Sequence, residues 1–145
     1  MARTFSVVGD YLRAGGAVAT AAPLTMACWF RTSNVVANMT LMYNGNSAAA
    51  GRYFALMAQG GVAGDPIVAR ATTNTPADAT TTTGYSANTW HHACAVFTSG
   101  TSRTAYIDGG SAGLNTTNRV PTNVDRTSIG NRDNGSTGTQ FNSGS

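Results

Sequence analysis

The sequence predicts an all-β protein in which two antiparallel sheets pack face to face as a sandwich. Glu and Lys, two of the best helix-forming residues, are absent, and Leu is scarce. Thr, Val and Tyr, which favour strands, are abundant and are interspersed with Asn and Gly. Short apolar or alternating runs are separated by turn residues at the intervals typical of a sandwich. Because we find no internal repeat or boundary, we expect residues 1–145 to form a single domain.

Three strands are expected in the N-terminal part of the chain. Residues 4–8 predict a first strand that ends at Gly9, and residues 11–13 predict a second, short strand before Gly15. Residues 24–31 predict the clearest early strand, because Leu24 and every second residue after it form one apolar face.

The middle of the chain predicts a further group of strands. Residues 39–43 and 53–58 flank a loop that is rich in glycine and amide side chains, and residues 67–71 follow a turn at Gly60. The Thr-rich segment 72–83 fits two alternatives, a loop that contains a weak strand or an edge strand.

The best-defined unit is a hairpin made of residues 90–97 and 103–107, which a loop of hairpin length connects. Asp108 and Gly109 then predict a second tight turn. The remaining chain is polar, and only residues 127–129 and 140–141 have the character of strands.

The charge pattern excludes some classes of partner. Charged residues make up 10% of the chain, against about 25% in a typical domain. The net charge is +3, but the nine cations are all Arg and are scattered from Arg3 to Arg132. Nucleic acid needs a cationic patch, so we expect no nucleic-acid partner. No apolar stretch is long enough for a signal peptide or a membrane span, so we expect no membrane partner.

The two cysteines, Cys28 and Cys94, each sit inside an apolar run, which favours buried, reduced thiols. A disulfide is the alternative if the two strands are neighbours.

Several segments carry a family resemblance. Residues 88–93 (NTWHHA) and 103–109 (RTAYIDG) resemble the "W-H-H-V-A … Y-V-D-G" signature of laminin-G-like, concanavalin A-like jelly rolls. Residues 23–30 (PLTMACWF) are similar to the "F-T-I-S-A-W-V" strand of that family, residues 9–12 (GDYL) to its opening "G-x-x-D-Y-V", and residues 127–130 (TSIG) to its late "I-G" strand. These landmarks occur in the family order along nearly the whole chain.

The resemblance implies a two-sheet jelly-roll sandwich with variable loops at its rim. It also implies a final strand after the "F-x-G-x" step, which here is residues 141–145. Two alternatives follow: the sequence is truncated at its C-terminus, or the open sheet edge is filled by another chain. We therefore expect either a longer protein or self-association through an open edge.

The resemblance is closest to stand-alone laminin-G-like proteins of tailed phages. It implies a virion protein that is made in the host cytoplasm and needs no signal peptide. Its partners would be other virion proteins or further copies of itself.

Enzymatic activity is not expected, and no catalytic residue is assigned. Glycoside hydrolysis needs two suitably spaced carboxylates, but the chain has no Glu, and its six Asp residues never stand two apart on one strand. Residues 109–113 match G-x-S-x-G, but they lie in a hairpin turn rather than in a strand–turn–helix. His91 and His92 point to opposite faces of a strand, so they cannot bind one metal ion together.

Two kinds of binding site are predicted. The fold often carries a Ca²⁺ ion at its rim, and Asp10, which matches the family "D-Y" step, and Asp133 are the candidate ligands. The alternative for Asp10 is that it caps the turn after Gly9, and no other cofactor is expected. A set of rim residues that suits the hydroxyl groups of a sugar comprises Tyr43, Asn44, Asn46, Arg52 and Tyr53. Trp29 and Trp90 lie within predicted strands, so we expect both in the core.

Two functions follow from these observations. The first is a non-enzymatic structural domain of a phage head or tail that attaches to other proteins. The alternative is a carbohydrate-binding module that recognises a cell-surface glycan.

Overall fold

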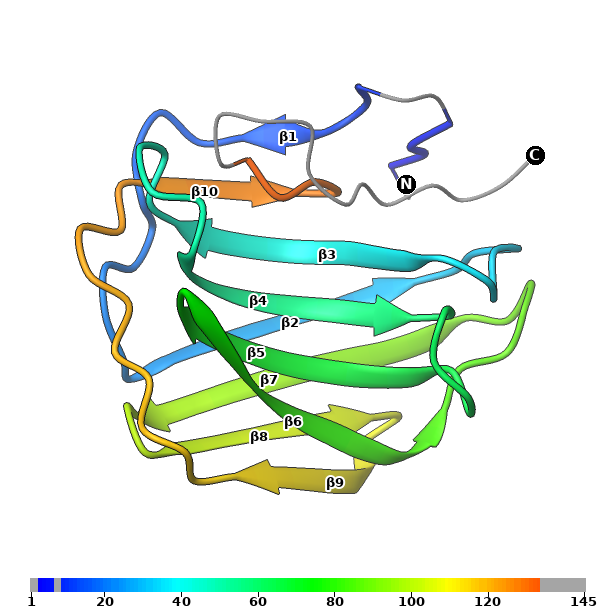
Figure 1. Ribbon diagram of the computed structural model, residues 1–145. Coiled ribbons are helices and arrows are strands. Elements are labelled where there is room, and N and C mark those ends of the chain that lie inside the picture. The colour runs from blue at the N-terminus through cyan, green and yellow to red at the C-terminus, as the bar shows by residue number, and fades with distance from the viewer. Residues whose placement is uncertain (1–2, 7–8, 134–145) are drawn as a thin grey trace.

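The computed structural model describes residues 3–6 and 9–133, and these residues fold into two sheets that pack face to face (Figure 1). The strands are β1 Leu12–Arg13, β2 Leu24–Phe30, β3 Asn38–Gly45, β4 Arg52–Gln59, β5 Pro66–Thr73, β6 Thr75–Gly84, β7 His91–Ser99, β8 Ser102–Ile107, β9 Gly110–Asn115 and β10 Arg126–Ile129. Six strands form one sheet in the order β1-β10-β3-β4-β5-β6, and four form the other in the order β2-β7-β8-β9. All neighbouring strands pair antiparallel. The predicted two-sheet sandwich is confirmed.

The strands lie close to where the sequence pattern predicts them, with three differences. The Thr-rich segment, for which two alternatives were open, forms the edge strand β6, in which Ala77 and Ala79 are buried between more exposed residues. β9 follows the Asp108 turn, although its sequence was interpreted as polar loop. No strand forms over residues 4–6, the described part of the expected first strand, and residues 140–141 lie outside the described residues. No helix occurs in the described part of the chain, and therefore none there could cross a membrane.

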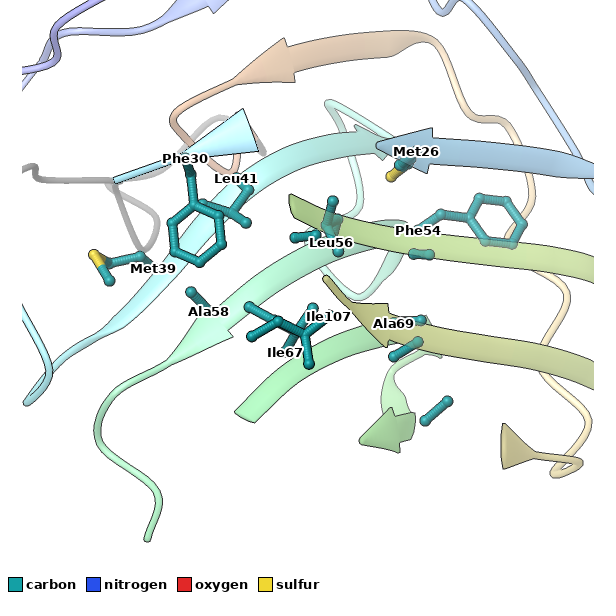
Figure 2. Packing of buried hydrophobic residues seen from close by; sticks show 14 of the residues in the cluster. Met26, Phe30, Met39, Leu41, Phe54, Leu56, Ala58, Ile67, Ala69 and Ile107 are labelled. Atoms are coloured by element: carbon teal, nitrogen blue, oxygen red, sulfur yellow. The ribbon is translucent and has the colours of Figure 1, made fainter. Parts of the chain in front are cut away.

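The main hydrophobic core lies between the two sheets. Phe54 of β4 and Phe97 of β7 meet edge to face with 5.1 Å between ring centroids, which ties one sheet to the other. Figure 2 shows how side chains from both sheets interleave. Other members of this core are Met26, Phe30, Met39, Leu41, Leu56, Ile67 and Ile107.

A second, smaller cluster packs on the outer face of the six-stranded sheet. It consists of Tyr43, Tyr53, Ala55, Met57 and Val68. β4 is therefore buried on both faces, because its alternate residues enter the two clusters in turn.

The two sheets are offset along their width. β9 packs against β6 at one end of the sandwich, and β2 packs against β3 and β4 near the other. Among the described residues, no strand of the four-stranded sheet lies against β10 or β1. The six-stranded sheet thus extends beyond β2.

Candidate functional site

The predicted rim residues are brought together, but the two tyrosines are buried. Tyr43 is 0% exposed and Tyr53 is 4% exposed, and their ring centroids lie 5.3 Å apart in the outer cluster. Arg132 covers Tyr53, with its guanidinium carbon 5.5 Å from the ring centroid and Nη1 3.3 Å from the hydroxyl oxygen. Burial raises the pKa of Tyr43 above its ordinary value. Neither ring offers an exposed face to a sugar, contrary to the expectation of rim aromatics.

The two asparagines of the set bind their own chain. Asn44 is 4% exposed, donates from Nδ2 to the carbonyl oxygen of Ala19 at 3.0 Å, and accepts a hydrogen bond from Thr127. Asn46 is 6% exposed, and its Oδ1 accepts the backbone N–H of Ala48 at 2.8 Å, as in an Asx-turn. The Asn46 amide thus shapes the β3–β4 loop, whereas the Asn44 amide ties β3 to Ala19 and to β10.

Arg52 and the loop itself are tied to the segment before β10. Nη1 of Arg52 donates to Oγ1 of Thr122 at 2.9 Å, and Oγ of Ser47 donates to Oδ2 of Asp125 at 2.7 Å. Hydrogen bonds from the Ser47 side chain and backbone lower the pKa of Asp125. The arrangement fastens the β3–β4 hairpin to β10, which is a structural role.

The two candidate Ca²⁺ ligands have other partners. Asp133 is 8% exposed and forms ion pairs with Arg126 at 3.3 Å and Arg13 at 3.5 Å. Two guanidinium groups beside one carboxylate disfavour a divalent cation there. Oδ2 of Asp10 accepts the backbone N–H of Ser6 at 2.9 Å. Within residues 3–6 and 9–133, no group of three or more His, Cys or Asp residues could hold a metal ion; Ca²⁺ binding at Asp10 stays a prediction.

His91 has the hydrogen-bond connectivity of a Ser–His–Asp triad. Its Nδ1 lies 2.8 Å from Oδ2 of Asp108, and its Nε2 lies 3.2 Å from Oγ of Ser86. However, Nε2 also accepts the backbone N–H of Ser86 at 3.0 Å, so its lone pair is already engaged and cannot activate the hydroxyl. The trio braces the segment before β7 against the turn after β8.

The exposed aromatic side chains lie elsewhere: Trp29 is on the outer face of the four-stranded sheet, and Trp90 directly precedes β7. Trp29 is 66% exposed and Trp90 is 52% exposed, so the expectation that both belong to the core is wrong. Trp29 of β2 pairs across the sheet with His92 of β7, with 5.4 Å between ring centroids. Tyr106 of β8 lies beside Cys94 on the same face. We call Trp29, Trp90, His92 and Tyr106 the aromatic strip.

The aromatic strip is uncharged. β2 and β7 contain no Asp or Arg, and the only charged residue of β8, Arg103, is fully buried on the inner side. Thr25 and Thr104 supply hydroxyl groups on the outer face. Such a surface can stack against apolar ring faces and exchange hydrogen bonds with hydroxyls, and β2, β7 and β8 place no carboxylate on it. The sequence indicated that Trp29 is exposed, because Trp29 alternates along β2 with the inward-facing residues Met26, Cys28 and Phe30.

The two antiparallel sheets, packed face to face, allow the family of the domain to be identified. The chain belongs to the Laminin_G_3 family of the concanavalin A-like lectin/glucanases superfamily, whose model matches residues 6–144. A comparison with the curated proteins gave no match.

Solved structures share the fold at low sequence identity. Domains LG4-5 of the mouse laminin α1 chain superpose with a TM-score of 0.68 at 15% identity, over 96% of this chain and 38% of theirs. Domain 4 of a GH43 extracellular arabinanase from Geobacillus stearothermophilus, in complex with arabinotriose, gives 0.67 at 14% identity, over 81% of this chain and 56% of that one. The CBM40 domain of the Ruminococcus gnavus IT-sialidase, bound to α2,3-sialyllactose, superposes with a TM-score of 0.65 at 10% sequence identity. The match covers 92% of this chain and 84% of that one. The chain thus spans well under two thirds of the first two structures.

Proposed function

We propose that this domain is a non-catalytic carbohydrate-binding module that stacks sugar rings on the aromatic strip. The observation that carries the proposal is the exposed indole of Trp29, held against His92 on an uncharged sheet face. An indole ring that stands in water at 66% exposure is costly unless a partner covers it, and the apolar face of a sugar ring is a suitable partner. Two structural neighbours, one in complex with arabinotriose and one bound to α2,3-sialyllactose, support this choice of ligand.

The carboxylates support binding without catalysis. The chain has no Glu, and five of its six Asp side chains are engaged by the protein itself, Asp10 by the backbone N–H of Ser6. Asp78 pairs with Arg70, Asp108 with His91, Asp125 with Ser47, and Asp133 with two arginines. Hydrolysis of a glycosidic bond requires a pair of carboxyl groups that face the substrate.

The proposal is tested with a glycan array that includes arabinan oligosaccharides and sialylated glycans. We expect specific binding, and we expect Trp29→Ala and Trp90→Ala to weaken it at least about tenfold, since each removes a stacking platform. Val36→Ala is the matched control, because Val36 is 79% exposed in the loop between β2 and β3. Absence of any bound glycan, or equal binding by Trp29→Ala and the parent, contradicts the proposal.

A second candidate function is attachment to other proteins as part of a phage virion. Its phage component rests on the sequence resemblance, and the same holds for its localisation in a virion assembled in the host cytoplasm. Attachment to a protein is supported by the low share of charged residues, which make up 10% of the chain. Detection of peptides from this chain in purified phage particles by mass spectrometry supports this function, and their absence from particles of a phage that encodes the chain contradicts it.

A further inference from the structure

Arg31 continues the outer face of β2 by one position beyond the strand. Burial alternates along this segment, so Trp29 and Arg31 are exposed on the outer face and Phe30 between them is buried. Trp29 pairs with His92 of β7. The same register, continued by one residue, sets Arg31 opposite Trp90, which directly precedes β7. A cation therefore lies beside one exposed indole and across from the other.

The guanidinium of Arg31 is anchored through one of its three nitrogens. Its Nε donates to the carbonyl oxygen of Asn88 at 2.9 Å, and the Asn88 backbone N–H donates to the carbonyl oxygen of Thr32 at 2.7 Å. The Asn88 segment is also tied to β7, because the backbone N–H of Ser86 donates to Nε2 of His91 at 3.0 Å. The described residues give Nη1 and Nη2 of Arg31 no hydrogen bond. The guanidinium is thus held in place with two nitrogens available to a ligand.

No Asp side chain neutralises Arg31. All six Asp of the sequence lie within residues 3–6 and 9–133, and none of the ion pairs formed there includes Arg31. Residues 134–145 contain neither Asp nor Glu. By contrast, Arg13, Arg70 and Arg126 each pair with an Asp. The positive charge of Arg31 is therefore available to an anion that comes from outside the chain.

A guanidinium beside an exposed indole selects a class of ligand. Nη1 and Nη2 of a planar guanidinium can donate two parallel hydrogen bonds to one carboxylate. The indole stacks against the apolar face of a sugar ring. A sugar that carries a carboxylate presents both groups on one rigid ring, whereas a neutral sugar uses the indole alone. An acidic peptide offers the carboxylate without the ring face.

We propose that the patch formed by Trp29, Arg31, Trp90 and His92 binds a carboxylated sugar residue. The sugar ring stacks on the aromatic strip, and its carboxylate accepts hydrogen bonds from Nη1 and Nη2 of Arg31. This inference rests on the proposed carbohydrate binding and names its ligand class. An acidic glycan consequently binds more tightly than a neutral glycan of the same size and shape.

The test compares acidic sugars with their neutral isosteres by isothermal titration calorimetry. The probes are α2,3-sialyllactose and trigalacturonic acid, each measured against the same compound with its carboxylates converted to primary amides. We expect the parent protein to bind at least one acid about tenfold more tightly than its amide, because the amide keeps the ring but loses the charge-assisted hydrogen bonds. NaCl at about 0.5 M should weaken binding of the acid and leave binding of the amide unchanged, since the ion pair is exposed.

A matched pair of arginine variants locates the carboxylate. Arg31→Gln is expected to lower the affinity for the acid about tenfold and to leave the affinity for the amide unchanged. Arg119→Gln is the control, because Nε of Arg119 also donates to a backbone carbonyl oxygen, that of Thr75 at 2.7 Å. Arg119 lies near the other end of β7, where its backbone N–H donates to the carbonyl oxygen of Gly100 at 2.8 Å. We expect this control to bind acid and amide as the parent does.

Failure of this inference is distinguishable from failure of the proposed function. Amides or arabinotriose that bind as tightly as the acids, with binding lost in Trp29→Ala, overturn the preference for acidic sugars and leave the proposed function intact. Absence of binding by every acid, amide and neutral sugar overturns both. The inference is also overturned if Arg31→Gln and Arg119→Gln bind the acid equally, or if a tetraglutamate peptide binds as tightly as the acids. The comparison of acid with amide uses the parent protein, so it decides the question even if Arg31→Gln does not fold.

Discussion

The guanidinium of Arg103 in β8 donates from Nη1 to Oδ1 of Asn115 in β9 at 3.0 Å, in a fully buried position. Its Nη2 donates to the carbonyl oxygens of Gly100 at 2.8 Å and Thr117 at 2.7 Å. All three acceptors are neutral. Burial lowers the pKa of Arg103, and the carbonyl and amide oxygens take the place of the lost water. One side chain thereby ties together the β7–β8 turn, β9 and the segment that follows it.

Arg103→Lys is expected to destabilise the fold by about 2–4 kcal/mol. The compact ammonium group of lysine cannot reach all three acceptors to which the planar guanidinium of Arg103 donates hydrogen bonds. Urea denaturation followed by circular dichroism measures the change. Arg119→Lys is the control, since the Arg119 side chain donates to backbone carbonyl oxygens at the exposed surface. Equal midpoints for the two variants would show that the buried network contributes little.

The stability that Asp108 provides is expected to depend on pH. Partial burial alone would raise its pKa, but hydrogen bonds from the His91 side chain and the His92 backbone N–H outweigh it, so the folded pKa is lowered. This contribution is therefore fully present above the unfolded pKa of about 3.9 and disappears as pH falls through the folded pKa. Because the side chain is 50% exposed, the contribution is at most about 1 kcal/mol.

Asp108→Asn should consequently have a lower melting temperature than the parent at pH 6, with the difference shrinking as the pH falls below 4. Thermal unfolding at a series of pH values measures this. A difference that stays constant down to pH 2 would mean that the ionised carboxylate is not what stabilises the turn.

β9 approaches β6 so closely that Gly113 has no room for a side chain. A Cβ atom at Gly113 would lie 1.8 Å from the carbonyl oxygen of Thr80. Gly113→Ala is expected to lower stability by about 1–3 kcal/mol, because backbone must move. Gly110→Ala in the same strand has no atom within 4 Å of its new Cβ and serves as the control. A loss of stability in Gly110→Ala as large as in Gly113→Ala would contradict the steric explanation.

The two thiols are expected to stay reduced and to react slowly. Cys28 pairs with Ala93 and Cys94 with Ala27, so the two side chains lie on opposite faces of the sheet and form no disulfide. Burial raises the pKa of Cys28 to about 12 and also raises that of Cys94. Ellman's reagent at pH 8 should therefore modify the native protein much more slowly than the urea-unfolded one. Rapid modification of both thiols in the native state would contradict this.

How well the sequence predicted each strand depended on how clearly apolar and polar residues alternate along it. β2 and β7 alternate between buried and exposed residues over most of their length, so the sequence locates them well. β9 was not predicted as a strand, because glycines and small residues dominate its sequence. It is buried through contact with β6, a strand far away in sequence. β6 could not be distinguished from a loop, because threonine suits both.

The candidate site was harder to predict than the fold. Tyr43 and Tyr53 border a loop, which suggested exposure, but residues from the far end of the chain, Arg132 among them, cover them. A signal was present: residues 53–58 form an unbroken apolar run, which is typical of a strand buried on both faces. Trp29 was predicted to be buried because it is apolar, but it is exposed. Its position in the alternating pattern of β2 places it on the outer face of the sheet.

The exposure of Trp29 and Trp90 has a practical consequence. These are the only two indoles in the chain, and both stand in water on the face to which we assign ligand binding. The intrinsic tryptophan fluorescence of the protein therefore comes from the aromatic strip. A blue shift of this fluorescence during titration with a ligand reports binding without an attached dye. Replacing Trp29 or Trp90 singly shows which of the two indoles the change in fluorescence comes from.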